Sequence, residues 1–270
     1  MKIMTIIGTR PEVIKLCRVI RKLDRHARHV LVHTGQNHDY ELNQIFFDQL
    51  QIRKPDHFLN VVGATLGETL GNVLARAYAV MVVERPDALL LLGDTNSCLA
   101  AIVAKRLKIP IFHMEAGNRC FDQRVPEELN RKIVDHLSDI NLTYSDHARE
   151  YLLREGLSPD RVIKTGSPMY EVLSHYRDHI DQSDVLTRLR LTSLEYFVVS
   201  AHREENVDSD RHVHQLVDLL HGIAETYGKR IVFSVHPRTK SRIDSAAISL
   251  PALVELHKPF GFFDYVSLQR

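Results

Sequence analysis

Acidic side chains follow two neighbouring apolar runs in the middle of the chain. Asp94 follows the run Ala88–Leu92, Glu115 follows the run Ile109–His113, and the pair Glu127-Glu128 opens the next helical pattern. Apolar residues between the two runs recur at helical spacing, which predicts a strand–helix–strand unit with parallel strands. Because parallel strands end at the same edge of a sheet, where open α/β sheets bind ligands, we expect Asp94, Glu115 and Glu128 to converge on one site.

Three carboxylates in one crevice suit proton transfer. Their mutual repulsion should raise at least one pKa, so that one group can hold a proton while another accepts one. Each residue also has a simpler interpretation. Asp94 could cap the helix that begins at Asn96, Glu127 complements the dipole of its own helix, and Arg131 could be only the ion-pair partner of Glu127 or Glu128. His113 is expected to pack beside the sheet.

An anion site is predicted at the first strand-to-helix turn. The apolar run Lys2–Ile7 ends at Gly8, and the helix that follows has Thr9 as its cap, with Arg10 and Lys15 on it. Free backbone N–H groups, the positive end of a helix and two cations favour a phosphate, although Arg10 and Lys15 could also be solvated surface charges. The GxGxxG pattern of dinucleotide-binding proteins is absent, so we expect no nicotinamide or flavin cofactor.

The order of strands and helices predicts an α/β fold with two Rossmann-like domains. The first covers residues 1–167, and the second, residues 168–270, contains a hinge and too few strands to close a sheet of its own. In the first domain, the helix between the two acidic runs should bury Leu99, Ile102, Val103 and Leu107. In the second, polar residues follow two predicted strands, which makes His236 and Arg238 candidate nucleotide contacts and places His202 at a strand end.

Composition excludes several classes of protein. The chain has 270 residues, 44% hydrophobic and 26% charged, with a net charge of +1, so neither nucleic acid nor an anionic membrane is an expected partner. No apolar run approaches the roughly 20 residues that span a bilayer, and the first residues do not form a signal peptide. Cys17, Cys98 and Cys120 contain no CxxC pair, which is typical of reduced core thiols in a cytoplasmic protein. No metal site is expected.

Five short motifs, taken together, resemble those of a known enzyme family, the non-hydrolysing UDP-N-acetylglucosamine 2-epimerases. In chain order they are Gly8-Thr9-Arg10-Pro11-Glu12 with Lys15, Gly93-Asp94-Thr95, His113-Met114-Glu115-Ala116-Gly117, Pro126-Glu127-Glu128-Leu129-Asn130-Arg131 and His202-Arg203-Glu204. The resemblance covers the whole chain and implies two Rossmann-like domains in the GT-B arrangement, a UDP-sugar substrate bound between them, no cofactor, and a homodimer. The family continues with a Ser-Gly-Gly segment that this sequence does not contain, so the second domain is expected to be truncated.

The resemblance implies an elimination mechanism, in which UDP leaves C1 while C2 loses its proton, and both then add back with C2 inverted. Asp94, Glu115 and Glu128 would be the acid–base groups, without an assignment of acid or base. His202 and Arg10 would steady the departing diphosphate, while Lys15 and Arg131 would balance charge or hold ligand. All of these groups are present in the sequence.

The segments Thr34-Gly35-Gln36-Asn37 and Asn118-Arg119-Cys120-Phe121-Asp122-Gln123 look most like the branch that forms UDP-N-acetyl-L-fucosamine for surface polysaccharides. Three alternatives stay open. The chain could form UDP-N-acetylmannosamine from UDP-N-acetylglucosamine, it could be a GT-B glycosyltransferase, which would need only one base and an acceptor pocket, or it could bind a UDP-sugar without turnover.

Overall fold

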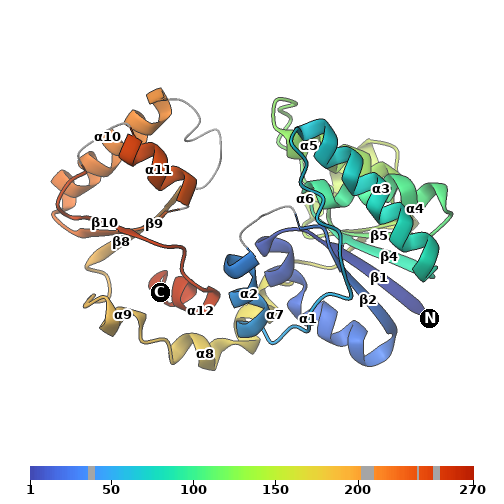
Figure 1. Ribbon diagram of the computed structural model, residues 1–270, viewed down its shortest axis with the longest axis horizontal. Helices are drawn as coiled ribbons and strands as arrows, with labels where there is room; N and C mark the ends of the chain where they lie inside the picture. Colours follow the sequence, from blue (N-terminus) through green and yellow to red (C-terminus); the bar gives the residue numbers. More distant parts are fainter. Residues whose placement is uncertain (36–39, 202–209, 236, 246–249) are drawn as a thin grey trace. The chain divides into compact units, whose positions relative to one another are not determined.

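The structure, a computed structural model, describes residues 1–35, 40–201, 210–235, 237–245 and 250–270. The chain forms two compact units, Met1–His175 and Tyr176–Arg270. Figure 1 shows the helices and strands of both units with their labels.

Unit 1 is built on a seven-stranded sheet in which every neighbouring pair of strands is parallel. The strand order is β3-β2-β1-β4-β5-β6-β7, so the direction of winding reverses between β1 and β4, the position where open α/β sheets bind ligands. The strands are β1 Lys2–Ile7, β2 Arg28–His33, β3 His57–Phe58, β4 Ala88–Leu92, β5 Ile111–Ala116, β6 Ile140–Thr143 and β7 Val162–Lys164. The parallel α/β class predicted from the sequence is confirmed.

Helices cover both faces of this sheet, which is why all five residues of β4 are buried. Helices α3, α4 and α5 lie side by side on one face, and α1 packs with α2 and α7 on the other (Figure 1). Their bounds are α1 Arg10–His26, α2 Tyr40–Gln49, α3 Leu66–Glu84, α4 Ala100–Arg106, α5 Pro126–Leu137, α6 Asp146–Arg154 and α7 Met169–His175, with 3₁₀ turns at Asn96–Leu99 and Pro159–Arg161.

The helix after β4 differs from its predicted form. Its fully buried residues are Ala100, Ala101 and Ala104, while Ile102 and Val103 are only partly buried at the border of the core. Of the expected stripe, Leu99 is buried in the preceding 3₁₀ turn and Leu107 is partly buried. Small side chains let α4 pack close to its neighbours, so the deepest positions are alanines rather than the larger residues that periodicity selected.

Unit 2 has a three-stranded parallel sheet in the order β10-β9-β8. Its main core lies between this sheet and α10, with Leu220, Ile231 and Phe233 fully buried. The elements are α8 Arg177–Asp181, α9 Val185–Arg188, β8 Tyr196–Ala201, α10 Asp210–Tyr227, β9 Arg230–Val235, α11 Pro237–Ser245, β10 Val254–His257 and α12 Phe262–Leu268. The sequence did not predict α2, β3 or α11. Among the described residues, no helix is both long and apolar enough to cross a membrane.

Candidate functional site

The turn after β1 is built around a buried carboxylate. Glu12 is 1% exposed and accepts hydrogen bonds from the N–H groups of Gly8 at 3.0 Å and Thr9 at 2.7 Å. The hydroxyl groups of Thr9, Thr95 and Ser97 also donate to it, the last at 2.5 Å. Burial raises the pKa of Glu12, against these hydrogen bonds, which lower it. Glu12 therefore joins the turn after β1 to the turn after β4, beyond the dipole role expected for a first-turn glutamate.

The two cations of the predicted anion site lie on helix α1. The guanidinium of Arg10 lies 5.8 Å from the centre of the Phe46 ring, a cation–π distance. Lys15 extends to the end of β5, where its Nζ lies 2.5 Å from Oε2 of Glu115. Lys15 is therefore the ion-pair partner of a candidate catalytic carboxylate.

Glu115 lies on a β-bulge. The register between β5 and β6 shifts between Met114 and Ala116, and Glu115 has φ of 66°, in the left-handed region. A bulge re-aims a side chain at the end of a strand, and this conformation costs on the order of 1–3 kcal/mol for a residue other than glycine. A Cβ atom on Gly93, the residue before Asp94, would lie 3.7 Å from Oε2 of Glu115. The ends of β4 and β5 thus bring Glu115 close to the backbone that bears Asp94.

Arg131, on helix α5, links the other two candidate carboxylates. Its Nε donates to Oδ2 of Asp94 at 2.7 Å, and its NH1 group donates to Oε2 of Glu128 at 2.7 Å. Asn130 donates to the backbone carbonyl of Asp94 at 2.8 Å. Arg131 is therefore an ion-pair partner of Glu128, as its simpler interpretation suggested, and also of Asp94, which sequence spacing did not suggest.

Glu128 is fully buried and its carboxylate accepts four hydrogen bonds among the described residues. The donors are the N–H groups of Cys120 at 3.0 Å and Phe121 at 3.2 Å, the Cys120 thiol at 3.4 Å, and the Arg131 guanidinium. Burial opposes ionisation, but these hydrogen bonds outweigh it and lower the pKa of Glu128. Repulsion between carboxylates was expected to raise a pKa, and at Glu128 the shift has the opposite sign. Cys120 itself is exposed, unlike the core thiol that was expected, whereas Cys17 and Cys98 are buried.

Behind the strand ends lies a second charged group, which the sequence reasoning missed. Asp135 on α5 is fully buried and accepts from His113 Nδ1 at 2.8 Å and Arg119 NH1 at 2.8 Å. Burial lowers the pKa of His113, but the Asp135 carboxylate and the bond to the Gly93 carbonyl raise it above its ordinary value. An acidic residue seven positions after Glu128, on the same helix and next to buried Val134, was the signal available in the sequence.

The described part of unit 1 contains six of the predicted site residues. Contacts join them in two sets, Lys15 with Glu115 and Arg131 with both Asp94 and Glu128, and Arg10 begins α1. The other three predicted site residues belong to the second domain. His202 and His236 lie outside the described residues, and Arg238 lies on α11.

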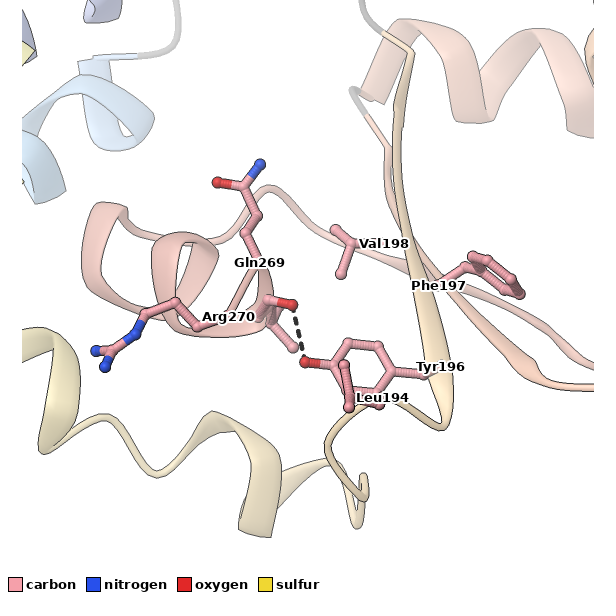
Figure 2. A pocket seen from close by; sticks show the side chains of 7 residues that line it. Leu194, Tyr196, Phe197, Val198, Gln269 and Arg270 are labelled. Atoms are coloured by element: carbon pink, nitrogen blue, oxygen red, sulfur yellow. Dashed lines mark hydrogen bonds between the residues drawn. The ribbon is translucent and has the colours of Figure 1, made fainter.

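Unit 2 contains a cavity of about 340 Å³ against its edge strand β8 (Figure 2). Its walls come from β8 and from the end of α12, and the Tyr196 hydroxyl donates to the Leu268 carbonyl at 2.8 Å. The lining residues are Leu194, Tyr196, Phe197, Val198, Leu268, Gln269 and Arg270. None of them is a predicted site residue, whereas the candidate carboxylates and their cationic partners belong to unit 1.

The strand-end edge of unit 1 can exchange protons and bind an anion. Asp94 and Glu115 keep 25% and 18% of their side chains exposed, whereas Glu128 is inaccessible. Two partly exposed carboxylates with cationic neighbours suit acid–base work at adjacent atoms of a ligand. Within the described part of the chain, no group of three or more His, Cys, Asp or Glu residues is placed to hold a metal ion.

Comparison with known proteins gives one consistent result. The family model described as UDP-N-acetylglucosamine 2-epimerase matches residues 21–270. The solved UDP-N-acetylglucosamine 2-epimerase of Rickettsia bellii is 51% identical, with a TM-score of 0.90 over 100% of this chain and 71% of that one. The Methanocaldococcus jannaschii enzyme, solved with UDP-GlcNAc and UDP, is 33% identical, with a TM-score of 0.92 over 100% and 76% of the two chains.

A third relative is named for a different UDP-sugar. The UDP-2,3-diacetamido-2,3-dideoxy-D-glucuronate 2-epimerase of Pseudomonas aeruginosa is 34% identical over 99% of this chain and 75% of its own length. The solved relatives have the GT-B-type fold, which confirms the predicted fold class.

Removal of the Arg131 side chain should change the titration of Glu128. In Arg131→Met we expect the pKa of Glu128 to rise, because a buried carboxylate loses its cation, and the free energy of unfolding at neutral pH to fall by about 3 kcal/mol. The pKa can be followed by NMR of ¹³C-labelled glutamate carboxyl groups. An unchanged Glu128 titration in this variant would contradict the assigned cause.

The stability of the wild type should reflect the same group. The folded-state pKa of Glu128 lies below the ordinary value of 4.5, so its stabilisation is present above that pH and is lost as pH falls through the folded-state pKa. Glu128→Gln should therefore lose less stability on acidification than the wild type in chemical denaturation. Glu127→Gln, which removes the neighbouring carboxylate from the same helical turn, should retain the wild-type pH dependence.

Proposed function

Because the chain belongs to the non-hydrolysing UDP-N-acetylglucosamine 2-epimerase family, and is therefore an isomerase, we propose that it inverts C2 of a UDP-N-acetylhexosamine by eliminating UDP and adding it back. The observation that supports this most directly is the pairing of Asp94 with Arg131 and of Glu115 with Lys15 at the end of parallel strands. A hydrogen on C2 is not acidic, so its removal needs a carboxylate held close to it while charge develops on the departing diphosphate.

The three carboxylates have different roles in this proposal. Asp94 and Glu115 exchange the protons, because both are partly exposed. Glu128 is buried, and its hydrogen bonds hold Arg131 and the backbone of Cys120 and Phe121. It thereby supports the site from behind, while its direct participation stays a prediction from the family resemblance.

The diphosphate is bound, in this proposal, by the turn after β1. The Gly8–Arg10 turn lies at the N-terminus of α1, where the helix dipole favours an anion. Arg10 begins this helix, and Lys15 is one turn further along. A phosphate that attracts Lys15 would release an oxygen of Glu115 for acid–base work, which couples substrate binding to the readiness of that carboxylate.

We propose UDP-N-acetyl-L-fucosamine as the product, made for surface polysaccharide synthesis. The loop 118–123 supports this choice, because its sequence resembles that branch and its Cys120 and Phe121 amides hold Glu128 beside the site. UDP-N-acetylmannosamine, formed from UDP-N-acetylglucosamine, is the second candidate. It is supported by the Rickettsia bellii and Methanocaldococcus jannaschii relatives, both of which are described as UDP-N-acetylglucosamine 2-epimerases.

Proton NMR in D₂O tests the reaction and its substrate together. With UDP-N-acetyl-L-fucosamine and UDP-N-acetylglucosamine in parallel tubes, we expect deuterium at C2 and the appearance of a second epimer in the first tube. Exchange in the second tube alone would transfer the assignment to the second candidate. If neither tube shows deuterium at C2, and sugar is transferred once an acceptor alcohol is added, the epimerase proposal would be refuted and a glycosyltransferase indicated.

Asp94→Asn and Glu115→Gln should separate chemistry from binding. Each variant should lower kcat by at least about 10²-fold, the typical contribution of a general acid or base, and leave the dissociation constant for UDP within about threefold. Asp146→Asn is the control, because Asp146 is an exposed carboxylate just after the next strand, β6, and pairs with Lys164. Turnover near the wild-type rate in either site variant would remove that residue from the mechanism.

We propose that two copies pair through the exposed apolar face of α3. Tyr78, Val82 and Val83 are 48%, 43% and 76% exposed, and Ala75 and Ala79 on the same face allow close helix approach. Val82→Glu should raise the dimer dissociation constant by at least about 100-fold, because it would bury a charge at the contact, as sedimentation velocity would show. Leu219→Glu, at a 59% exposed site on α10, is the control. A monomeric wild type would refute the proposal.

A further inference from the structure

Behind the candidate carboxylates, charged side chains form a buried row. From the interior outwards it consists of His113, Asp135, Arg119 and Glu155, and the side chains of the first three are completely inaccessible. Arg119 NH1 lies 2.8 Å from Asp135, and its Nε and NH2 groups each donate to Glu155 at 2.7 Å. None of these four residues belongs to the set that exchanges protons in the proposed reaction.

Both nitrogens of the His113 ring face acceptors. Nδ1 lies 2.8 Å from the Asp135 carboxylate, and Nε2 lies 2.8 Å from the carbonyl oxygen of Gly93. A neutral imidazole would point a lone pair at one of these oxygens, so the geometry requires an imidazolium. The row then alternates two cations with two anions.

Asp135 is also bonded directly to the backbone at the end of β5. The N–H of Gly117 lies 3.3 Å from Oδ1 and 3.2 Å from Oδ2 of Asp135. Gly117 has φ of 80°, and a Cβ atom there would lie 2.3 Å from the carbonyl oxygen of Ala148. This position therefore has no room for a side chain, and its backbone is held against both α6 and Asp135.

These contacts place one carboxylate at the junction of all three elements that bear the candidate catalytic groups. Asp135 binds His113, which binds the carbonyl of Gly93, the residue before Asp94. Asp135 also accepts a hydrogen bond from the N–H of Gly117, two residues after Glu115. It belongs to the same helix, α5, as Glu128 and Arg131. We propose that Asp135 is a positioning residue, which fixes the distance between Asp94 and Glu115 through the Gly93 carbonyl and the Gly117 N–H.

The expected effect of Asp135 on kcat rests on the proposed epimerase function, whereas its expected effect on the backbone of the two strand ends does not. Elimination across C1 and C2 needs two carboxylates at a fixed separation, and a misplacement of about 1 Å can cost about 10²-fold in rate. Binding of UDP depends on other groups, Arg10 and the turn after β1. Loss of Asp135 should therefore reduce kcat and leave the affinity for UDP almost unchanged.

Two substitutions separate geometry from charge. Asp135→Ala removes every bond, and we expect kcat to fall by about 10- to 100-fold. Asp135→Asn can keep the pattern, because its amide can donate to a neutral His113 while its oxygen accepts from Arg119 and Gly117. The kcat of Asp135→Asn should therefore be at least about tenfold higher than that of Asp135→Ala. His113 should be neutral in this variant and carry its proton on Nε2. The ¹⁵N shifts of the labelled histidine ring would report that change.

Glu155→Gln is the matched control. Glu155 belongs to the same charged row and binds Arg119, but it contacts neither His113 nor the backbone of Gly93 or Gly117. We expect Glu155→Gln to keep kcat within about twofold of the wild type. An equal loss of kcat in Glu155→Gln and Asp135→Ala, or a loss of UDP affinity as large as the loss of kcat in Asp135→Ala, would overturn the inference.

Backbone amide shifts make the test independent of turnover. In Asp135→Ala the amide signals of Asp94 and Gly117 should move, and in Glu155→Gln they should stay in place. Asp135→Asn covers the case in which Asp135→Ala fails to fold, since its His113 ring should change protonation while both amides stay close to their wild-type shifts. If the wild type epimerises none of the tested sugars, the proposed function fails, and the amide shifts alone decide whether Asp135 holds the two strand ends.

Discussion

A carboxylate that is buried away from water needs hydrogen-bond donors. Glu12 has this requirement between β1 and β4 of unit 1, where the direction in which the chain winds along the sheet reverses. Its donors come from two turns, Gly8 and Thr9 after β1, and Thr95 and Ser97 after β4. The effective penalty for a buried, unsatisfied charge is several kcal/mol. The two turns therefore cannot separate without leaving Glu12 unsatisfied, and they bear Arg10 and Asp94. The proximity of Arg10 and Asp94 at one edge of the sheet therefore depends on the hydrogen bonds that a buried carboxylate requires.

The carboxylates along this edge of the sheet fall into a buried group and a partly exposed group. Glu12, Asp135 and Glu128 are buried carboxylates, and each accepts donors from at least two different segments of the chain. Asp94 and Glu115 are instead partly exposed, and among the residues that the structure describes each has one cationic partner in an ion pair. Buried acceptors hold the backbone, whereas the accessible acceptors are the acid–base groups of the proposed function. This difference in exposure explains why five carboxylates can share one edge without competing for one role.

The sequence predicted the layout of unit 1 well, because continuous apolar runs between turn residues report buried parallel strands. The local backbone geometry was harder to predict from the sequence. Glu115 was predicted to follow its strand, but it lies within β5 on a bulge. Its φ of 66° could not be predicted, because glutamate is not a residue type that favours positive φ. Thr9 and Glu12 form a capping box, and the Glu12 carboxylate also reaches a second strand end, which the local sequence pattern does not signal. Pairs such as His113 with Asp135 are made by tertiary packing, which periodicity does not encode.

Buried ion pairs are weak contributors to stability, and apolar side chains of similar volume often replace them without loss. That replacement would fail here, because the groups to be satisfied are backbone atoms. The Gly93 carbonyl and the Gly117 N–H lie at strand ends, where the ladder no longer supplies their partners, and His113 and Asp135 supply them instead. The strained backbone of Glu115 lies between these two anchored points in the sheet. A conformation that costs on the order of 1–3 kcal/mol persists only when its surroundings over-determine it, and the charged row behind the sheet provides that constraint.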